Sequence, residues 1–218
     1  MRTARNVFVG IPHHITQRGN YRMDVFLDDE DRERYLAWLW EYAERYELEI
    51  WAYCLMGTHV HHVGVPHRED SLGRTFGLAH MRYSQYFNRK RRQAGHLWQG
   101  RFFSCPLDEV HAYRAARYVE QNAVRAGLVA QARDWPWSSA RIHLAGQTLK
   151  GASWPEDKAL GKWSVLLGEP DKPAELEAIR KQTYTGRPWG SERFITRLES
   201  LAKKVLRALP RGRPKAGK

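Results

Sequence analysis

The sequence is poor in cysteine and has no long apolar run. Its two cysteines, Cys54 and Cys105, stand in apolar or aromatic surroundings without a CxxC pair. This pattern favours reduced core thiols over a disulfide framework or a cysteine zinc site. No stretch approaches the roughly 20 apolar residues that cross a bilayer, and residues 1–10 lack the apolar segment of a secretory signal. We therefore expect a cytoplasmic protein without a membrane partner.

Acidic residues are scarce relative to basic ones. Only 24 Asp and Glu stand against 36 Lys and Arg among 218 residues, a formal net charge of +12. The positive electrostatic field of such a protein favours phosphate polyanions as binding partners. With membranes set aside, nucleic acid becomes the leading partner. The hydrophobic share of 42%, with 9 Trp, 10 Tyr and 7 Phe, excludes a disordered or collagen-like chain. The length fits one main domain with an extension.

Periodicity predicts six regular elements in the first half of the chain. Runs rich in β-formers alternate with segments whose apolar residues recur at helical spacing. We expect a strand at 13–18, a helix after the acidic cluster 28–30, strands at 48–55 and 58–65, a helix at 71–92 and a strand at 101–105. This order predicts an α+β fold of the ferredoxin-like, split βαβ type, an antiparallel sheet with helices on one face.

The rest of the chain adds helices to this fold. Asp108 suits the N-cap of a further helix, from about 109 to 125, which Gly127 would end. After residue 145 the chain becomes rich in Gly, Pro and Lys before helical periodicity returns. We therefore expect a main domain of residues 1–145 and a small, basic, α-helical C-terminal extension of residues 146–218.

Two histidines share one face of the strand predicted at 58–65. Residues i and i+2 of a strand point the same way, so His59 and His61 project together while His62 points to the opposite face. Two adjacent imidazoles can hold one divalent cation if a third ligand comes from another element. Histidines that bond only to backbone carbonyls are the alternative.

The helix predicted at 109–125 offers that third ligand. Tyr118 and Asn122 are four residues apart, so both point to one side of the helix. The Asn122 amide could complete a site with the two imidazoles, and the Tyr118 phenol could attack a phosphorus atom to form a phosphotyrosine. A core tyrosine beside a polar helix end is the structural alternative.

Several segments together resemble a known family. Residues 53–61, YCLMGTHVH, resemble the His-hydrophobic-His segment of the single-tyrosine HUH transposases, in particular the REP-associated tyrosine transposases. Residues 95–102 (GHLWQGRF) and 117–129 (RYVEQNAVRAGLV) resemble later blocks of that family, in the same order and at similar distances. The likeness runs from about residue 13 to 139, and the TGRP run at 185–188 resembles the tail of many members.

The resemblance implies a ferredoxin-like nuclease that nicks and rejoins single-stranded DNA, with REP-type hairpins as substrates. His59 and His61 match the family's metal-binding histidines, Tyr118 its nucleophile, and Asn122 the polar residue that helps to hold the metal. The implied cofactor is a divalent metal, Mg²⁺ or Mn²⁺, and the implied products are a 5′-phosphotyrosine and a free 3′-hydroxyl. Association with the bacterial nucleoid is a further expectation, and a homodimer is compatible with the family.

The chain departs from the family pattern in three places. Gly57-Thr58 stand where Pro-Asn is common, His62 replaces an apolar residue, and Ala123 replaces Pro. None of these changes removes a proposed ligand or the nucleophile. We expect that His62 could compete for the metal and that Ala123 alters how the helix presents Asn122.

Basic and aromatic residues outside this set are candidates for DNA contact. The basic side chains would bind phosphates, and Trp98 or Phe102 would stack an unpaired base; the alternative is a solvated helix face with core aromatics. The phosphate-binding candidates are Arg82, Arg89, Lys90, Arg91, Arg92 and Arg101. Arg211 and Arg213 lie in a run, RGRP, that resembles an AT-hook core entering the minor groove, and a solubilising tail is equally compatible.

Two other functions remain compatible with the sequence. The chain could have kept the fold and DNA binding but lost catalysis, acting as a regulator, or it could hydrolyse small phosphoesters. A regulator would bind DNA in a salt-dependent way without cutting it. A hydrolase would turn over its substrate without a covalent DNA adduct.

Overall fold

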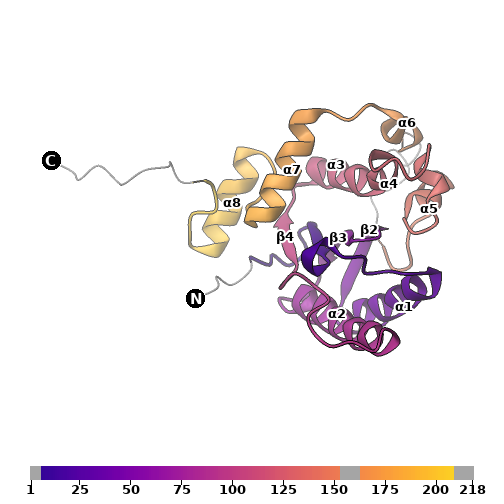
Figure 1. Cartoon of the computed structure of the whole chain (residues 1–218). Coiled ribbons are helices and arrows are strands. Elements are labelled where there is room, and N and C mark those ends of the chain that lie inside the picture. Colours follow the sequence, from indigo (N-terminus) through magenta and orange to yellow (C-terminus); the bar gives the residue numbers. More distant parts are fainter. Residues whose placement is uncertain (1–5, 153–162, 209–218) are drawn as a thin grey trace.

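The centre of the computed structural model, which describes residues 6–152 and 163–208, is a four-stranded antiparallel sheet. The strands, in the spatial order β2-β3-β1-β4, are β1 (His13–Arg18), β2 (Leu48–Leu55), β3 (His59–Pro66) and β4 (Phe103–Pro106). After β1 and the short turn η1 (Asn20–Arg22), helix α1 (Asp29–Arg45) leads to β2, and α2 (Ser71–Lys90) joins β3 to β4 (Figure 1). This connectivity confirms the predicted α+β, ferredoxin-like class.

Local sequence signals place most element boundaries correctly. The Asp28 side chain accepts a hydrogen bond from the backbone N–H of Asp31 at 3.0 Å, so α1 begins at the predicted acidic cluster. Asp108 accepts one from His111 at 2.9 Å and is the predicted N-cap. The fourth strand starts two residues later than predicted, because the chain still turns at Gly100, where φ is +104°.

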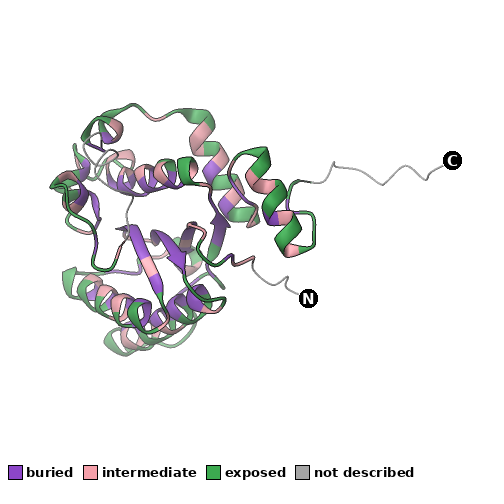
Figure 2. Ribbon diagram, turned by 180° about the vertical axis from the view of Figure 1, so that it is seen from behind, coloured by how far each residue is buried: buried purple, intermediate pink, exposed green. Residues whose placement is uncertain are grey.

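Helices cover both faces of the sheet: the two helices of the ferredoxin-like unit share one face, as predicted, and helices that follow β4 add a second layer on the other. Leu55 and Val60 pack with α1 and α2 on one face. Cys54 and Val63 pack with α3 (Glu109–Glu120) on the other. Strands β2 and β3 are buried along nearly their whole length (Figure 2), since they carry apolar side chains on both faces. A sheet of this composition requires a layer of helices on each side.

The long helix predicted at 109–125 is interrupted at Gln121. It forms α3 and a short α4 (Asn122–Arg125), with Gln121 between them at φ −79° and ψ 1°. At this point the Gln121 side chain donates a hydrogen bond to the carbonyl of Leu167. The angles stay near the helical region, so the break is slight and Tyr118 and Asn122 still line the same cavity.

Two of the helices beyond residue 145 pack on the same core as α3. The chain continues through η2 (Ala132–Asp134), α5 (Ala140–Leu144), α6 (Trp163–Gly168), α7 (Pro173–Thr185) and α8 (Glu192–Ala202). Trp163 of α6 and Ile179 of α7 belong to the cluster that contains the buried face of α3. The predicted helical character of this part is confirmed, whereas a domain boundary at 145 stays a prediction. Arg211 and Arg213 lie outside the described residues.

The described residues contain two buried thiols and no helix able to span a membrane. Cys54 and Cys105 are buried and free, as predicted. Burial raises the pKa of the Cys105 thiol to about 12, so it stays protonated at neutral pH. Within the described ranges, no helix combines the length and apolar character that crossing a bilayer requires.

A buried carboxylate ties α3 to the segments that follow it. Glu120 is fully buried and accepts hydrogen bonds from Ser139 Oγ (2.5 Å), His143 Nδ1 (2.5 Å) and Trp163 Nε1 (2.9 Å). Ser139 and His143 precede residue 145, whereas Trp163 belongs to α6. One side chain therefore links the predicted main domain to the first helix of the predicted extension.

His62 points away from His61, into the core formed with α1 and α2. It is fully buried, with ring centroids 5.0 Å from Phe76 and 6.1 Å from Tyr35. Neither of its ring nitrogens has a hydrogen-bond partner among the described residues. The expectation that His62 could compete for a metal was wrong, because it lies on the opposite face from His59 and His61.

Replacing Glu120 with Ala should destabilise the fold by about 3–5 kcal/mol, because buried donors lose a charged acceptor. Urea unfolding monitored by tryptophan fluorescence measures the change. Glu177→Ala, at an exposed position of α7, is the control and should shift stability by less than about 0.5 kcal/mol. A loss in Glu120→Ala as small as that of the control would contradict the assigned role.

His62→Leu should stabilise the protein by about 1–3 kcal/mol, because it removes two buried ring nitrogens that have no partner. The same unfolding assay applies. Gln17→Leu is the matched comparison on the same face: its Nε2 donates to the Gly100 carbonyl at 2.9 Å, so this variant should lose stability. Equal destabilisation by both substitutions would argue against an unsatisfied His62.

Candidate active site

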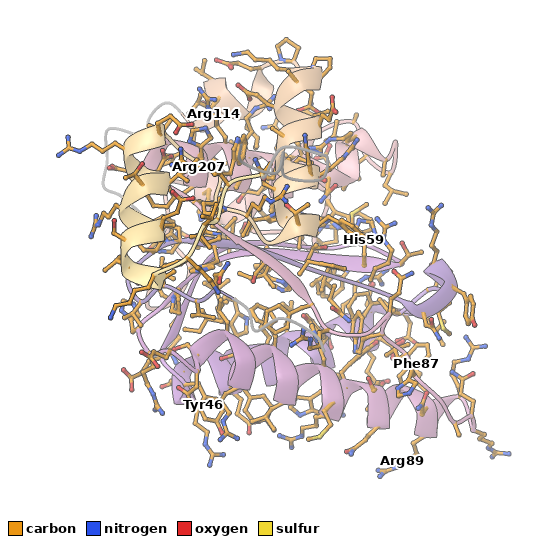
Figure 3. The ribbon with its side chains drawn as sticks, turned by 90° about the vertical axis from the view of Figure 1, so that its left-hand side faces the viewer. Tyr46, His59, Phe87, Arg89, Arg114 and Arg207 are labelled. Carbon is orange, nitrogen blue, oxygen red and sulfur yellow. The ribbon has the colours of Figure 1, made fainter. Side chains whose placement is uncertain are left out.

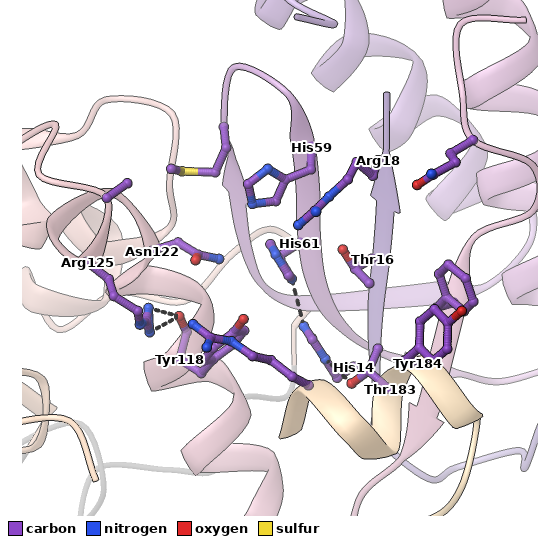
Figure 4. A pocket seen from close by; sticks show the side chains of 15 residues that line it. His14, Thr16, Arg18, His59, His61, Tyr118, Asn122, Arg125, Thr183 and Tyr184 are labelled. Carbon is purple, nitrogen blue, oxygen red and sulfur yellow. Dashed lines mark hydrogen bonds between the residues drawn. The ribbon is translucent and has the colours of Figure 1, made fainter. Parts of the chain in front are cut away.

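A cavity of about 610 Å³ lies between the sheet and helices α3, α4 and α7 (Figure 4). Alternate residues of β1 and β3 form its floor, because their side chains share one face of the sheet. The antiparallel register sets Arg18 opposite His59 and Thr16 opposite His61. The cavity is lined by His14, Thr16, Arg18, Met56, His59, His61, Gln99, Phe103, Tyr118, Asn122, Arg125, Ala126, Arg180, Thr183 and Tyr184.

Four residues nominated from separate motifs meet in this cavity: His59, His61, Tyr118 and Asn122. The ring centroids of His59 and His61 lie 5.0 Å apart, with 84° between the ring planes. Asn122 extends toward them from α4 in Figure 4. The ring of Tyr118 stands edge-on to His61, at 5.6 Å between centroids. The structure thus brings together every side chain that the sequence nominated as a metal ligand or nucleophile.

The two candidate ligand histidines are neutral, and each has one nitrogen engaged. Burial, followed by the charge of Arg18, lowers the pKa of His59 to about 4, and burial lowers the pKa of His61 well below its usual value. His59 Nδ1 lies 2.9 Å from Thr58 Oγ1, and His61 Nδ1 lies 3.0 Å from His14 Nε2. Nε2 of each ring remains for a ligand, and the neutral imidazole is the form that binds metal.

The donor set fits a divalent cation held by two imidazoles and one amide. Asn122 is 8% exposed, and its Nδ2 has no hydrogen-bond partner among the described residues. A buried amide NH₂ group without an acceptor is unfavourable, so a phosphate oxygen on Nδ2 would stabilise it, whereas a cation would bind the amide oxygen of the same side chain. Across those same ranges, no three or more His, Cys, Asp and Glu side chains group as metal ligands, so a site here would depend on Asn122.

Arg125 contacts Tyr118 from α4. Its guanidinium carbon lies 4.5 Å from the centroid of the Tyr118 ring. Its Nη1 and Nη2 donate hydrogen bonds to the Tyr118 carbonyl at 3.2 and 3.0 Å, and its Nε donates to Asp171 at 3.0 Å. These contacts fix both the ring and the backbone of Tyr118 relative to α4.

The cavity is lined with positive charge. Arg18, Arg125 and Arg180 contribute to it, and none of the described residues that line it is acidic, although Arg125 is paired with Asp171 outside the lining. The buried histidines add no positive charge at neutral pH, because their pKa values are lowered. Guanidinium groups bind phosphate through charge-assisted hydrogen bonds, so the lining suits a phosphodiester.

Sequence reasoning missed several residues of this cavity. The signal for His14 and Arg18 was present, because strand alternation sets both on one face of β1, and pairing with β3 brings that face beside His59 and His61. No local pattern marks Thr183, which lies 169 residues along the chain from its hydrogen-bond partner His14. Only the tertiary structure brings α7 to the site.

The predicted phosphate-binding cluster lies on the other side of the sheet from the cavity. Helix α2 packs on that far face, and Figure 3 shows Arg89 well separated from His59. Arg82 forms an ion pair with Glu41 at 2.9 Å. A role in DNA binding therefore stays a prediction, and it would concern a separate surface. The members carried by α2 and the residues after it are Arg82, Arg89, Lys90, Arg91 and Arg92.

Trp98 and Phe102 are core residues in this structure. Each is 6% exposed. Trp98 Nε1 donates a hydrogen bond to the His80 carbonyl at 3.2 Å, and the rings of His80 and Tyr83 pack against Trp98. Rings buried in this way present no open face to a base. Arg101 is exposed beside them, and its role in phosphate binding stays a prediction.

The chain is similar to known proteins over much of its length. Residues 8–122, more than half of the chain, match the family model "Transposase IS200 like". A Haemophilus influenzae protein named as a REP-associated tyrosine transposase is 25% identical over 161 residues, which cover 65% of this chain and 88% of that protein. The solved structure of a REP-associated tyrosine transposase bound to a REP hairpin has the same fold, with a TM-score of 0.53 and 21% identity, over 72% of this chain and 92% of its own. These similarities confirm the resemblance to REP-associated tyrosine transposases, and the chain belongs to the IS200-like transposase family.

Proposed function

We propose that this protein is a metal-dependent single-stranded DNA nickase and strand transferase that acts on REP-type hairpins. The observation that carries the proposal is the convergence of His59, His61, Asn122 and Tyr118 in one cavity lined by arginines. Membership of a transposase family supports DNA processing in general. The residues of the cavity support the finer chemistry.

The Tyr118 phenol is the proposed nucleophile. Its Oη forms a bond to the scissile phosphorus while the bond from phosphorus to the 3′ oxygen breaks. The phenol loses its proton and the departing 3′ oxygen gains one, which leaves a 5′-phosphotyrosine and a free 3′-hydroxyl. Because the tyrosine ester conserves the energy of the phosphodiester, a second 3′-hydroxyl can reverse the step and join strands without ATP.

His59, His61 and Asn122 would hold the divalent cation. When bound, Mg²⁺ or Mn²⁺ neutralises charge on the non-bridging oxygens of the scissile phosphate. Arg18 and Arg180 would orient the same phosphate through charge-assisted hydrogen bonds. Two imidazole ligands favour Mn²⁺ over Mg²⁺, so Mn²⁺ is the first ion to test.

A DNA hairpin with a single-stranded flank is the proposed partner. The structural relative is a transposase bound to a REP hairpin. The net charge of +12 supports attraction to DNA, and the cavity of about 610 Å³ is large enough for a nucleotide. We propose that the flank enters the cavity between β3 and α7 while the hairpin stays outside it.

Tyr118→Phe should abolish the covalent adduct and slow nicking by at least about a thousandfold, because the nucleophile is lost. The assay uses a single-stranded hairpin oligonucleotide labelled at its 3′ end, with Mn²⁺. Attack by Tyr118 leaves this label on the protein, where a denaturing gel detects it. Gel shifts in the same buffer check that the variant still binds the hairpin.

Tyr113→Phe, on the same helix but outside the cavity lining, is the matched control and should form the adduct as the wild type does. Equal labelling of Tyr118→Phe would overturn the nucleophile. Hairpin binding by the wild type without cleavage in any divalent metal would favour the regulator. Turnover of a small phosphoester without an adduct would favour the hydrolase.

Asn122→Leu should lower Mn²⁺ affinity by at least about tenfold, because the third ligand is removed while a side chain of similar size remains. Mn²⁺ electron paramagnetic resonance titration measures the affinity without DNA. Asn122→Asp keeps an oxygen donor and should bind Mn²⁺ at least as well as the wild type. Asn88→Leu on α2 is the control, and an Asn122→Leu variant with the affinity of that control would rule out Asn122 as a ligand.

A further inference from the structure

We propose that His14 and Thr183 are positioning residues that hold His61 in the tautomer able to bind a metal ion. Helix α7 would then complete the candidate active site, although it lies in the part of the chain predicted to be an extension. The inference rests on the proposed function, because it takes His61 to be one of the residues that bind the metal ion. Its geometric basis is a line of buried hydrogen bonds.

The hydrogen bonds run from the cavity to α7. His61 Nδ1 lies 3.0 Å from His14 Nε2, and His14 Nδ1 lies 2.7 Å from Thr183 Oγ1 (Figure 4). Thr183 Oγ1 in turn lies 3.4 Å from Cys105 Sγ. The rings of His14 and His61 are almost parallel, with 2° between their planes. His14 is 1% exposed and Thr183 2% exposed, so water does not compete for these bonds.

A neutral imidazole carries one hydrogen, so this line can run in only two directions. In the first, His61 Nδ1–H donates to His14 Nε2 and His14 Nδ1–H donates to Thr183 Oγ1, which leaves the lone pair of His61 Nε2 for a ligand. In the second, every donor and acceptor is exchanged, and His61 Nε2 carries the hydrogen. Only the first direction allows His61 Nε2 to bind a cation.

Thr183 is the end of the line whose hydroxyl permits the first direction. Its hydroxyl oxygen can accept from His14 while its own hydrogen is donated to the sulfur of Cys105. Without that hydroxyl, a hydrogen on His14 Nδ1 would face no acceptor. His14 would then carry its hydrogen on Nε2 and donate to His61 Nδ1, which moves the hydrogen of His61 to the metal-binding nitrogen.

The segment after Thr183 holds the end of α7 against the sheet. Gly186 ends α7 in the left-handed region, with φ +69°. Three residues later, the Trp189 N–H donates to the Pro106 carbonyl at 2.9 Å, and Asp108 Oδ2 accepts from the Ser191 N–H at 2.8 Å. The TGRP run at 185–188 lies between Thr183 and these anchors, so a motif that the proposed chemistry does not use would hold Thr183 in place.

The test compares Thr183→Val, which replaces the hydroxyl by a methyl group of similar volume, with the wild type. Mn²⁺ affinity, titrated by electron paramagnetic resonance, should fall by about 10- to 100-fold. In the metal-free protein, ¹⁵N chemical shifts of His61 should move from the Nδ1–H pattern to the Nε2–H pattern. A purely structural role of Thr183 would not change that tautomer.

Two further variants complete the comparison. Thr183→Ser restores the hydroxyl and should recover Mn²⁺ affinity to within about threefold. Thr185→Val is the matched control, because the Thr185 hydroxyl donates only to carbonyls of its own helix, those of Lys181 and Gln182. Should Thr183→Val not fold, His14→Gln, which keeps an acceptor for His61, should retain Mn²⁺ affinity, whereas His14→Leu should lose it.

Wild-type affinity and tautomer in Thr183→Val would overturn the proposal, as would a wild-type His61 that carries its hydrogen on Nε2 in the metal-free protein. Failure of the proposed function gives a different result: the wild type would neither bind Mn²⁺ nor cut the hairpin. The tautomer of His61 is measured without metal or DNA, so it decides the positioning role even then.

Discussion

The pairing of β1 with β3 is the interaction on which the candidate active site depends. Its register sets Arg18 opposite His59 and Thr16 opposite His61, on the face that carries the cavity. Because side chains alternate along a strand, a slip of one residue would turn both histidines into the core beneath α1 and α2. The burial of Ile15 and Val60 on that opposite face opposes such a slip. Packing on one side of the sheet thus maintains chemistry on the other.

The two faces of the sheet therefore have different roles. Helices α1 and α2 cover one face with a continuous apolar core. The other face is apolar under α3 and α6 but polar where α4 and α7 approach β1 and β3. Buried polar groups there are stabilised by direct partners, as His14 is by His61 and Thr183. The Nδ2 of Asn122 has no such partner among the described residues, so a ligand that accepts a hydrogen bond would stabilise this side chain.

The sequence was sufficient for features encoded by local patterns. Alternation and helical periodicity predicted the four strands, the helices α1, α2 and α3 and their connectivity, and strand geometry predicted that His59 and His61 share a face while His62 does not. It was insufficient where side chains from distant segments meet. The second layer of helices, the break at Gln121 and the arrival of Thr183 at His14 depend on packing between elements, which no local period records.

The positive charge of the candidate active site also depends on how distant segments meet. The most concentrated basic run, residues 89–92, lies at the end of α2, away from the cavity, and Lys90 is already paired with Asp28 and Asp31 at 2.7 Å. The positive lining of the cavity instead comes from three arginines that lie far apart in the sequence, Arg18, Arg125 and Arg180. A charge run spreads around an exposed helix end and is screened by salt, whereas Arg18 from a strand and Arg180 from a helix line the same cavity and can bind one phosphate. The local field at the site is therefore a product of the fold, and the net charge of +12 describes only attraction at longer range.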